Sequence, residues 1–146
     1  GESQYENFFN ELCARNPGRV GVYIGFNAKL AQEIYAGADM FLMPSKSEPC
    51  GLSQMVALRY GSIPVVRETD GLKDSITDSG DGKGNGFTFQ TYDTQDMLNS
   101  VHRAIYAYNE SKDGWKVLVE RAMACDNSWG RSANDYIRLY KQLINS

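Results

Sequence analysis

The sequence predicts the α/β fold class, with a mainly parallel sheet followed by a C-terminal helical segment. Short β-rich or apolar runs alternate with helical patterns up to residue 89, as they do in βαβ units. From residue 94 onward, the apolar residues recur only at helical spacing. The 146 residues fit a single domain and contain no internal repeat and no obvious domain boundary.

The N-terminal part predicts a helix, a strand and a second helix. Ser3 and Glu6 have the spacing of a capping box, in which both side chains satisfy free backbone N–H groups. Asn-Pro-Gly at residues 16–18 ends this helix. Residues 20–24 form a short β-rich run, and Asn27 is the candidate N-cap of the second helix.

The middle of the chain predicts strands and helices in alternation. Met40 to Met43 are apolar at consecutive positions, as in a strand that is covered on both faces. A helix over about 52–60 leads to Gly61, a natural C-terminal cap. The elements expected next are a strand at 63–66, a short helical turn at 71–76, a loop at 77–85 and a last strand at 86–89.

Three amphipathic helices are expected from Thr94 onward, with Asp113 and Ser128 as N-caps of the second and third. His102 is the only histidine, and we expect it on the surface of the first helix. The loop acids Asp78 and Asp81 lack the pattern of a calcium-binding loop, so we expect them to be solvated.

The composition limits the class of protein. A net charge of −3, without a stretch rich in Lys and Arg, argues against nucleic-acid binding. The three cysteines, Cys13, Cys50 and Cys125, lack metal-ligand spacing, which favours reduced thiols in a cytosolic protein. We find no signal peptide and no apolar run that could span a bilayer, so we expect no membrane partner.

The segment Pro44 to Gly51 is the candidate ligand site, because open α/β folds bind ligands outside the carboxyl ends of their strands. A helix that begins near Gly51 or Leu52 directs free N–H groups and its positive dipole end into this crevice, which favours phosphate. Gly51 also lets the backbone approach an anion closely.

Glu48 precedes Pro49, which biases it toward an extended conformation. Its carboxylate would repel a phosphate, so it is better suited to accept hydrogen bonds from the hydroxyls of an adjoining sugar. The alternative is that Glu48 is a solvated loop acid and that the following turn only starts a helix.

Several segments closely resemble bacterial glycogen synthases and plant starch synthases. The main ones are DMFLMPSKSEPCG at 39–51 and LRYGSIPVVRETDGLKDSI at 58–76. RVGVYIGFN at 19–27, GNGFTFQ at 84–90 and MACDNSWGRSANDYIRLY at 123–140 extend the resemblance over nearly the whole chain in one collinear order. These enzymes are retaining glucosyltransferases of the GT-B architecture that use a nucleotide-diphosphate glucose, so the resemblance implies a Rossmann-like C-terminal domain.

The resemblance implies a role for each residue of the segment. Glu48 matches the acidic residue that contacts the hydroxyls of the donor glucose and is needed for activity. Cys50, Gly51 and Leu52 match the turn whose N–H groups face the sugar and the diphosphate. Ser53 takes the place of a small hydroxyl residue near the distal phosphate.

Phe26 matches an aromatic residue, commonly Tyr, that packs against the adenine ring; Phe keeps the stacking face and loses the hydroxyl. Its alternative role is core packing. A nucleophilic role for Cys50 is rejected, because no base is evident to activate the thiol.

The sequence also departs from related enzymes at two places. Val56 stands where other retaining transferases carry a second Glu, which argues against a sucrose or trehalose-type synthase. Residues 69–72 are Thr-Asp-Gly-Leu where TGGL is usual, which leaves the shape of that loop open.

The resemblance covers only the later part of the C-terminal domain, so we expect the N-terminal acceptor domain and the first strands of the C-terminal domain to be absent. In the family those strands carry the Arg and Lys that neutralise the diphosphate, and Lys29, Lys46 and Arg67 lie outside the matching segment. We therefore expect the isolated fragment to be inactive.

The predicted function is that of the donor-binding C-terminal fragment of a glycogen (starch) synthase. The whole enzyme would transfer glucose from ADP-glucose to the non-reducing end of an α-1,4-glucan with retention. No metal and no cofactor are implied, and the α-glucan acceptor would bind through the missing domain. The alternative is a stand-alone module that binds a nucleotide or sugar nucleotide without catalysis.

Two expectations concern the state of the molecule. Loss of the first strands would leave the strand at 40–43 with an exposed edge, which invites rearrangement or pairing in a homodimer. The expected localisation is cytoplasmic, or plastidial if the source is a plant.

Overall fold

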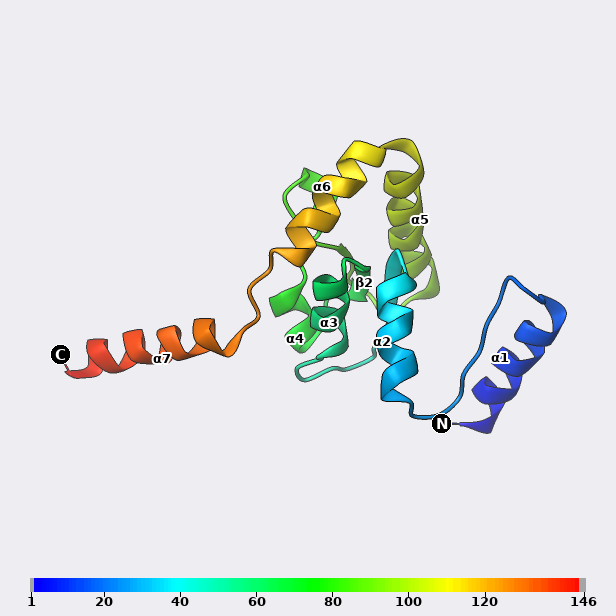
Figure 1. Cartoon of the computed structure of the whole chain (residues 1–146), viewed down its shortest axis with the longest axis horizontal. Coiled ribbons are helices and arrows are strands. Elements are labelled where there is room, and N and C mark those ends of the chain that lie inside the picture. The colour runs from blue at the N-terminus through cyan, green and yellow to red at the C-terminus, as the bar shows by residue number, and fades with distance from the viewer. Residues whose placement is uncertain (1, 145–146) are drawn as a thin grey trace. The chain divides into compact units, whose positions relative to one another are not determined.

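The computed structural model describes residues 2–144, and the chain divides into two compact units between Gln32 and Glu33. The division falls within helix α2 (Ala28–Gly37). The first unit contains α1 (Ser3–Arg15), and the second contains the sheet and the helices that follow α2 (Figure 1).

The first unit departs from the predictions at two points. Helix α1 begins at Ser3 itself and is capped by Glu2 without a side-chain hydrogen bond, so the predicted capping box is wrong. Residues 20–24 belong to no helix and form no strand with any described residue. A strand is defined by its ladder partner, which a local β-rich pattern does not supply.

The predicted parallel sheet is confirmed in the second unit. Its strands are β1 (Met40–Met43), β2 (Ile63–Arg67) and β3 (Phe87–Phe89), in that spatial order. Both pairings are parallel, with Met43 opposite Val66 and Val65 opposite Phe87. Within residues 2–144, β1 pairs only with β2, so the expected free edge is present.

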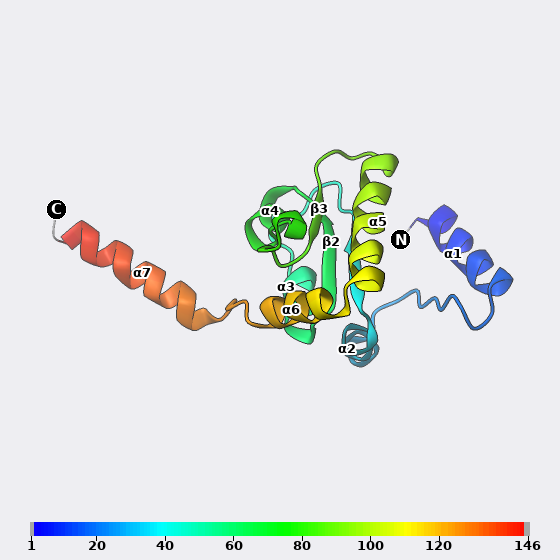
Figure 2. The same ribbon diagram turned by 90° about the horizontal axis from the view of Figure 1, so that it is seen from above.

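Helices cover both faces of this sheet. Figure 2 shows β2 and β3 with α5 on one side and α4 on the other. The helices of this unit after β1 are α3 (Ser53–Tyr60), α4 (Asp70–Ser75), α5 (Thr94–Glu110), α6 (Lys112–Met123) and α7 (Trp129–Ile144). Coverage on both faces explains why β2 is apolar at consecutive positions and buried from Ile63 to Val66.

The core lies between the sheet and helices α3 to α6. Fully burying an apolar side chain contributes roughly 1.5–3 kcal/mol, so this cluster is the main source of stability. Its largest members are Leu58, Ile63, Val65, Val66, Leu72, Ile76, Phe87, Trp115 and Leu118.

Two of the predicted caps are confirmed, and a second one, besides the capping box of α1, is wrong. Asn27 Oδ1 accepts a hydrogen bond from the Leu30 amide at 3.1 Å at the start of α2. Gly61 ends α3 in the left-handed conformation, with φ of 77°. Asp113 does not cap α6, because Ser111 ends α5 and its Oγ accepts from the Gly114 amide at 3.1 Å.

The expected loop at 77–85 is only partly solvated. It contains a single 3-10 turn, η1 (Ser79–Asp81), and Asp81 is exposed as expected. Asp78 is half-buried and bound to Arg103, so its predicted solvation is wrong. His102 is exposed on α5, as predicted.

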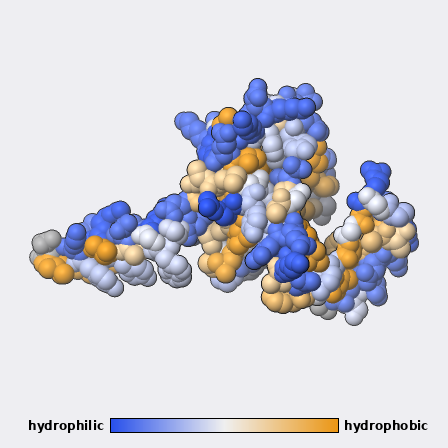
Figure 3. Space-filling model, in the orientation of Figure 1, coloured by the Kyte–Doolittle hydropathy of each residue, from blue (hydrophilic) through white to orange (hydrophobic). Residues whose placement is uncertain are grey.

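Helix α7 is amphipathic, yet none of its described residues is buried. Figure 3 shows apolar atoms toward its C-terminal end among hydrophilic ones. Its exposed large apolar residues are Trp129, Tyr136, Ile137, Leu139, Tyr140, Leu143 and Ile144. No helix within residues 2–144 combines the length and apolar character needed to cross a membrane.

Candidate functional site

The loop of residues 44–52 carries chain from the carboxyl end of β1 to the start of α3. We call residues Glu48 to Leu52 within it the elbow. Because β1 and β2 are parallel neighbours, their carboxyl ends meet at the same edge of the sheet. The elbow and the residues that follow β2 therefore lie together, where open α/β folds bind ligands.

Gly51 has a backbone conformation that favours glycine, with φ of +68°. A Cβ added at this position would lie 2.5 Å from Oε1 of Gln54, which is closer than real Cβ contacts allow. The backbone angle therefore favours glycine at the turn that leads into α3, and a larger residue would also displace the end of the Gln54 side chain.

The start of α3 presents unpaired backbone donors. Leu52 is its N-cap and provides no side-chain hydrogen bond. The amides of the N-cap and the first three helical residues, Leu52 to Met55, have no partner within a helix, and none donates to another residue within 2–144. Free amides at the positive end of a helix dipole are suited to bind an anion.

The side chain of Gln54 holds the backbone of the elbow through hydrogen bonds. Its side chain is fully buried, and Nε2 donates to the carbonyl oxygens of Cys50 at 3.2 Å and Gly51 at 2.7 Å. The same nitrogen lies 3.0 Å from Oγ of Ser75 on α4. Sequence reasoning missed this residue, because a glutamine in a first helical turn is usually a surface residue.

Glu48 has a fixed backbone and a free carboxylate. Its amide donates to Oδ2 of Asp70 at 3.3 Å, and its carbonyl accepts from the Gly71 amide at 3.3 Å. The side chain is half-buried, and its carboxylate makes no hydrogen bond or ion pair with any residue of the described range. The acid is therefore available to a ligand.

Arg67 and Asp70 also bind the loop before the elbow and were not predicted as site residues. Arg67 Nε donates to the Ser45 carbonyl at 2.9 Å, and its Nη2 donates to the Lys46 carbonyl. The Glu48 amide, followed by the Thr69 hydroxyl, lowers the pKa of Asp70. Asp70 is therefore an anion at neutral pH.

The structure brings five of the six predicted site residues together. Glu48, Cys50, Gly51, Leu52 and Ser53 form one continuous segment, in which Cys50 and Leu52 are exposed and Ser53 is half-buried. Phe26 belongs to the first unit, and 94% of its surface is exposed. Core packing, the alternative role considered for Phe26, is therefore wrong.

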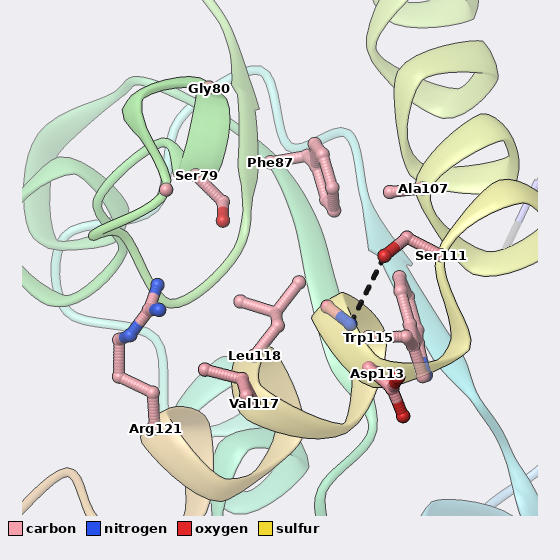
Figure 4. A pocket seen from close by; sticks show the side chains of 12 residues that line it. Ser79, Gly80, Phe87, Ala107, Ser111, Asp113, Trp115, Val117, Leu118 and Arg121 are labelled. Carbon is pink, nitrogen blue, oxygen red and sulfur yellow. Dashed lines mark hydrogen bonds between the residues drawn. The ribbon is translucent and has the colours of Figure 1, made fainter.

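A separate cavity of about 530 Å³ lies near Phe87, the first residue of β3 (Figure 4). It is thus near the amino end of a strand, away from the edge that carries the elbow. Two of its polar side chains are bound within the fold: Ser111 accepts from the Gly114 amide and Arg121 donates to the Gly84 carbonyl. We assign no ligand to it.

Metal-binding side chains are not clustered in the part of the chain that the structure describes. Within residues 2–144, no group of three or more His, Cys, Asp or Glu side chains is arranged to hold a metal ion. The three cysteines all have free thiols.

Comparison with known proteins gives one family and close relatives. The sequence model of the family "Glycosyl transferases group 1" matches residues 1–114. Glycogen synthase of Geobacillus thermodenitrificans is 53% identical over 146 residues, which are 99% of this chain and 30% of that protein. The chain therefore spans less than a third of the length of this relative.

Solved structures give the same picture. The catalytic domain of starch synthase IV from Arabidopsis thaliana, bound to ADP and acarbose, has a TM-score of 0.86 at 39% identity. The match covers 99% of this chain and 30% of that one. Sucrose-phosphate synthase from Thermosynechococcus elongatus, at 22% identity and a TM-score of 0.66, shares the fold.

Proposed function

Because the chain belongs to the group 1 glycosyl transferases, we propose that it is the donor-binding C-terminal portion of a glycogen (starch) synthase. The whole enzyme transfers glucose from ADP-glucose to the non-reducing end of an α-1,4-glucan with retention. The identity of 53% to a glycogen synthase supports this assignment.

The observation that carries the proposal is the geometry of the elbow. Unpaired amides at the start of α3 follow directly after Gly51, and the free carboxylate of Glu48 lies three residues before it. The amides bind the diphosphate, while the carboxylate accepts hydrogen bonds from glucose hydroxyls. Glu48 thus orients the donor for transfer and performs no proton transfer.

The remaining residues complete the donor site. The amides of Cys50, Gly51 and Leu52 face the sugar and diphosphate, and Ser53 binds the distal phosphate. Phe26 stacks on the adenine ring, and its exposure of 94% leaves the ring face free to do so.

ADP-glucose is the proposed donor in preference to UDP-glucose. The starch synthase IV structure is of a complex with ADP, and that protein is 39% identical to this chain. Localisation in the cytoplasm, or in plastids if the source is a plant, follows from the same assignment.

Catalysis requires more than the elbow. A departing nucleoside diphosphate needs cationic groups, because negative charge develops on it in the transition state. Arg67 is engaged with the Ser45 and Lys46 carbonyls and is not available for this role. We propose that the part of the enzyme outside this chain supplies these cations and binds the glucan, so that the chain alone transfers no glucose.

A ligand titration of the chain followed by amide NMR tests the donor site. ADP and ADP-glucose should both shift the amides of Gly51 to Ser53 and the ring of Phe26, and UDP should do so less. Glu48→Ala should weaken ADP-glucose binding about tenfold, since a bond to a charged group is lost, and should leave ADP binding unchanged.

Asp74→Ala, which removes an exposed acid from the neighbouring helix α4, is the matched control. Shifts confined to other surfaces, or equal loss of ADP and ADP-glucose binding in Glu48→Ala, would contradict the assignment. Glucose transfer by the chain alone would overturn the division of roles. A protein carrying this sequence that binds ADP-glucose tightly and never transfers glucose would be a binding module.

We also propose that the isolated chain pairs with another copy of itself along the free edge of β1. Backbone donors and acceptors on that edge have no partner strand within residues 2–144, and such edges associate readily. Light scattering at increasing concentration should show a shift from monomer to dimer. A monomer at all concentrations would refute the pairing.

A further inference from the structure

Two side chains, one from the last residue of β2 and one from the first residue of α4, hold residues 45–48, the last of which begins the elbow. Arg67 donates to the carbonyls of Ser45 and Lys46, and Asp70 Oδ2 accepts from the Ser47 hydroxyl and the Glu48 amide, both at 3.3 Å. The Arg67 guanidinium thus binds the carbonyl acceptors of this segment, and the Asp70 carboxylate binds its hydroxyl and amide donors. We call Arg67 and Asp70 the loop clamp.

Asp70 has an unusual backbone as well as an unusual set of contacts. Its φ of 40° makes it the only residue other than glycine within 2–144 with a positive φ. Asp tolerates this left-handed region better than most residues, because its short side chain can bond locally. The Thr69 hydroxyl makes such a local bond to Oδ2 at 3.1 Å.

This backbone conformation brings the next residue against the elbow. Gly71 donates its amide to the Glu48 carbonyl at 3.3 Å, and a Cβ on Gly71 would lie 2.4 Å from the carbonyl oxygen of Cys50. Both polar groups of the Glu48 main chain are therefore held by consecutive residues, Asp70 and Gly71. No such contact reaches the Glu48 carboxylate from within residues 2–144.

We propose that Asp70 is a positioning residue that sets the direction of the Glu48 side chain for the donor sugar, with Arg67 holding the preceding residues. The inference rests on the proposed function, because it concerns how the glucose-binding acid is held. Asp70 stands where the resemblance to starch and glycogen synthases leads us to expect glycine. The carboxylate is thus a feature of this chain's own loop.

The test compares Asp70→Gly with Asp70→Asn. Glycine accepts the positive φ and removes the Asp70 part of the loop clamp, whereas asparagine keeps an oxygen that can accept from the Glu48 amide. Asp70→Gly should weaken ADP-glucose binding about fivefold, the effect expected for a lost hydrogen bond, and leave ADP binding within about twofold. Asp70→Asn should restore ADP-glucose binding to within about twofold of the wild type.

Amide hydrogen exchange of Glu48 gives a readout that needs no ligand. Exchange should accelerate about fivefold or more in Asp70→Gly, because the amide loses its acceptor, and should stay near the wild-type rate in Asp70→Asn. Asp74→Asn on the exposed side of α4 serves as the control and should change neither measurement.

The outcomes separate this inference from the proposed function. Faster exchange with unchanged ADP-glucose binding would overturn the positioning role, and unchanged exchange in Asp70→Gly would overturn the clamp itself. If the wild type binds neither ligand, the donor role falls together with the proposed function. The exchange rate then still decides whether Asp70 holds Glu48.

Discussion

Arg103 binds both carboxylate oxygens of Asp78, with Nη1–Oδ1 and Nη2–Oδ2 distances of 2.8 Å. The Asp78 carboxylate also accepts from the amides of Thr88 and Gly80, each at 2.8 Å. Arg103 lies on α5 and Thr88 on β3. One carboxylate therefore joins the loop before β3 to the strand and to the helix that covers it.

The pKa of Asp78 reflects this arrangement. Partial burial raises it, but the hydrogen bonds from Arg103, Thr88 and Gly80 outweigh burial and lower the pKa from 3.8 to about 2. Since the pKa is lower in the folded state, the ionised group stabilises the fold above about pH 4. That contribution is lost as the pH falls toward 2.

Asp78→Asn should lower the free energy of unfolding at pH 7 by about 1–2 kcal/mol, a range that allows for the solvent exposure of the pair. At pH 3, the loss of unfolding free energy relative to the wild type should be about half of its value at pH 7. Urea unfolding at both pH values measures it. Asp81→Asn in the exposed part of the same loop is the control. A difference that does not change with pH would contradict the role of the ion pair.

Gly51→Ala should destabilise the fold by about 1–3 kcal/mol and weaken ADP binding, because it adds a Cβ at a positive φ. Gly82→Ala is a matched control, since Gly82 has φ of +75° and nothing within 4 Å of the added Cβ. Both variants carry the backbone strain, and only Gly51→Ala also meets Gln54. Urea unfolding and ADP titration should show a larger stability loss in Gly51→Ala. Equal losses would mean that the Gln54 contact is unimportant.

The elements between residues 40 and 89 could be predicted because their signals are local. An apolar run such as 40–43, a glycine such as Gly61 and a proline at the start of β2 each restrict the backbone where they stand. The strand expected at 20–24 failed for the opposite reason. A strand requires a neighbour, and within residues 2–144 that segment has none.

The same contrast between local signals and contacts with distant residues applies to the candidate site. The elbow is contiguous, so its glycine and helix start were evident from the sequence. Arg67 and Asp70 reach the loop of residues 44–52 from more than 20 residues away, because the register of β1 on β2 places Met43 opposite Val66. A sequence pattern does not fix that register. Asp70, where the resemblance leads us to expect glycine, marks the loop as unusual but does not predict its contacts.

Phe26→Ala should leave the free energy of unfolding within about 0.5 kcal/mol of the wild type, because the side chain is 94% exposed. It should reduce ADP affinity about fivefold if the ring stacks on adenine. Phe26→Tyr should retain the affinity. Phe8→Ala, at an exposed phenylalanine of α1, controls for a general loss of aromatic surface. Unchanged ADP binding in Phe26→Ala would remove this residue from the donor site.

Gln54→Leu keeps roughly the volume of a fully buried side chain and removes its donor nitrogen. The carbonyls of Cys50 and Gly51 then lose a shared partner, which should cost about 1–3 kcal/mol of unfolding free energy. Because these carbonyls fix the turn before α3, ADP binding should weaken as well. Urea unfolding and ADP titration measure both effects.

The control for this variant is Gln142→Leu, which makes the same change at an exposed position of α7. It should leave both quantities near the wild type. Loss of stability without loss of ADP affinity would show that Gln54 supports the fold alone. The anion site would then depend on the helix start and not on the shape of the turn that Gln54 holds.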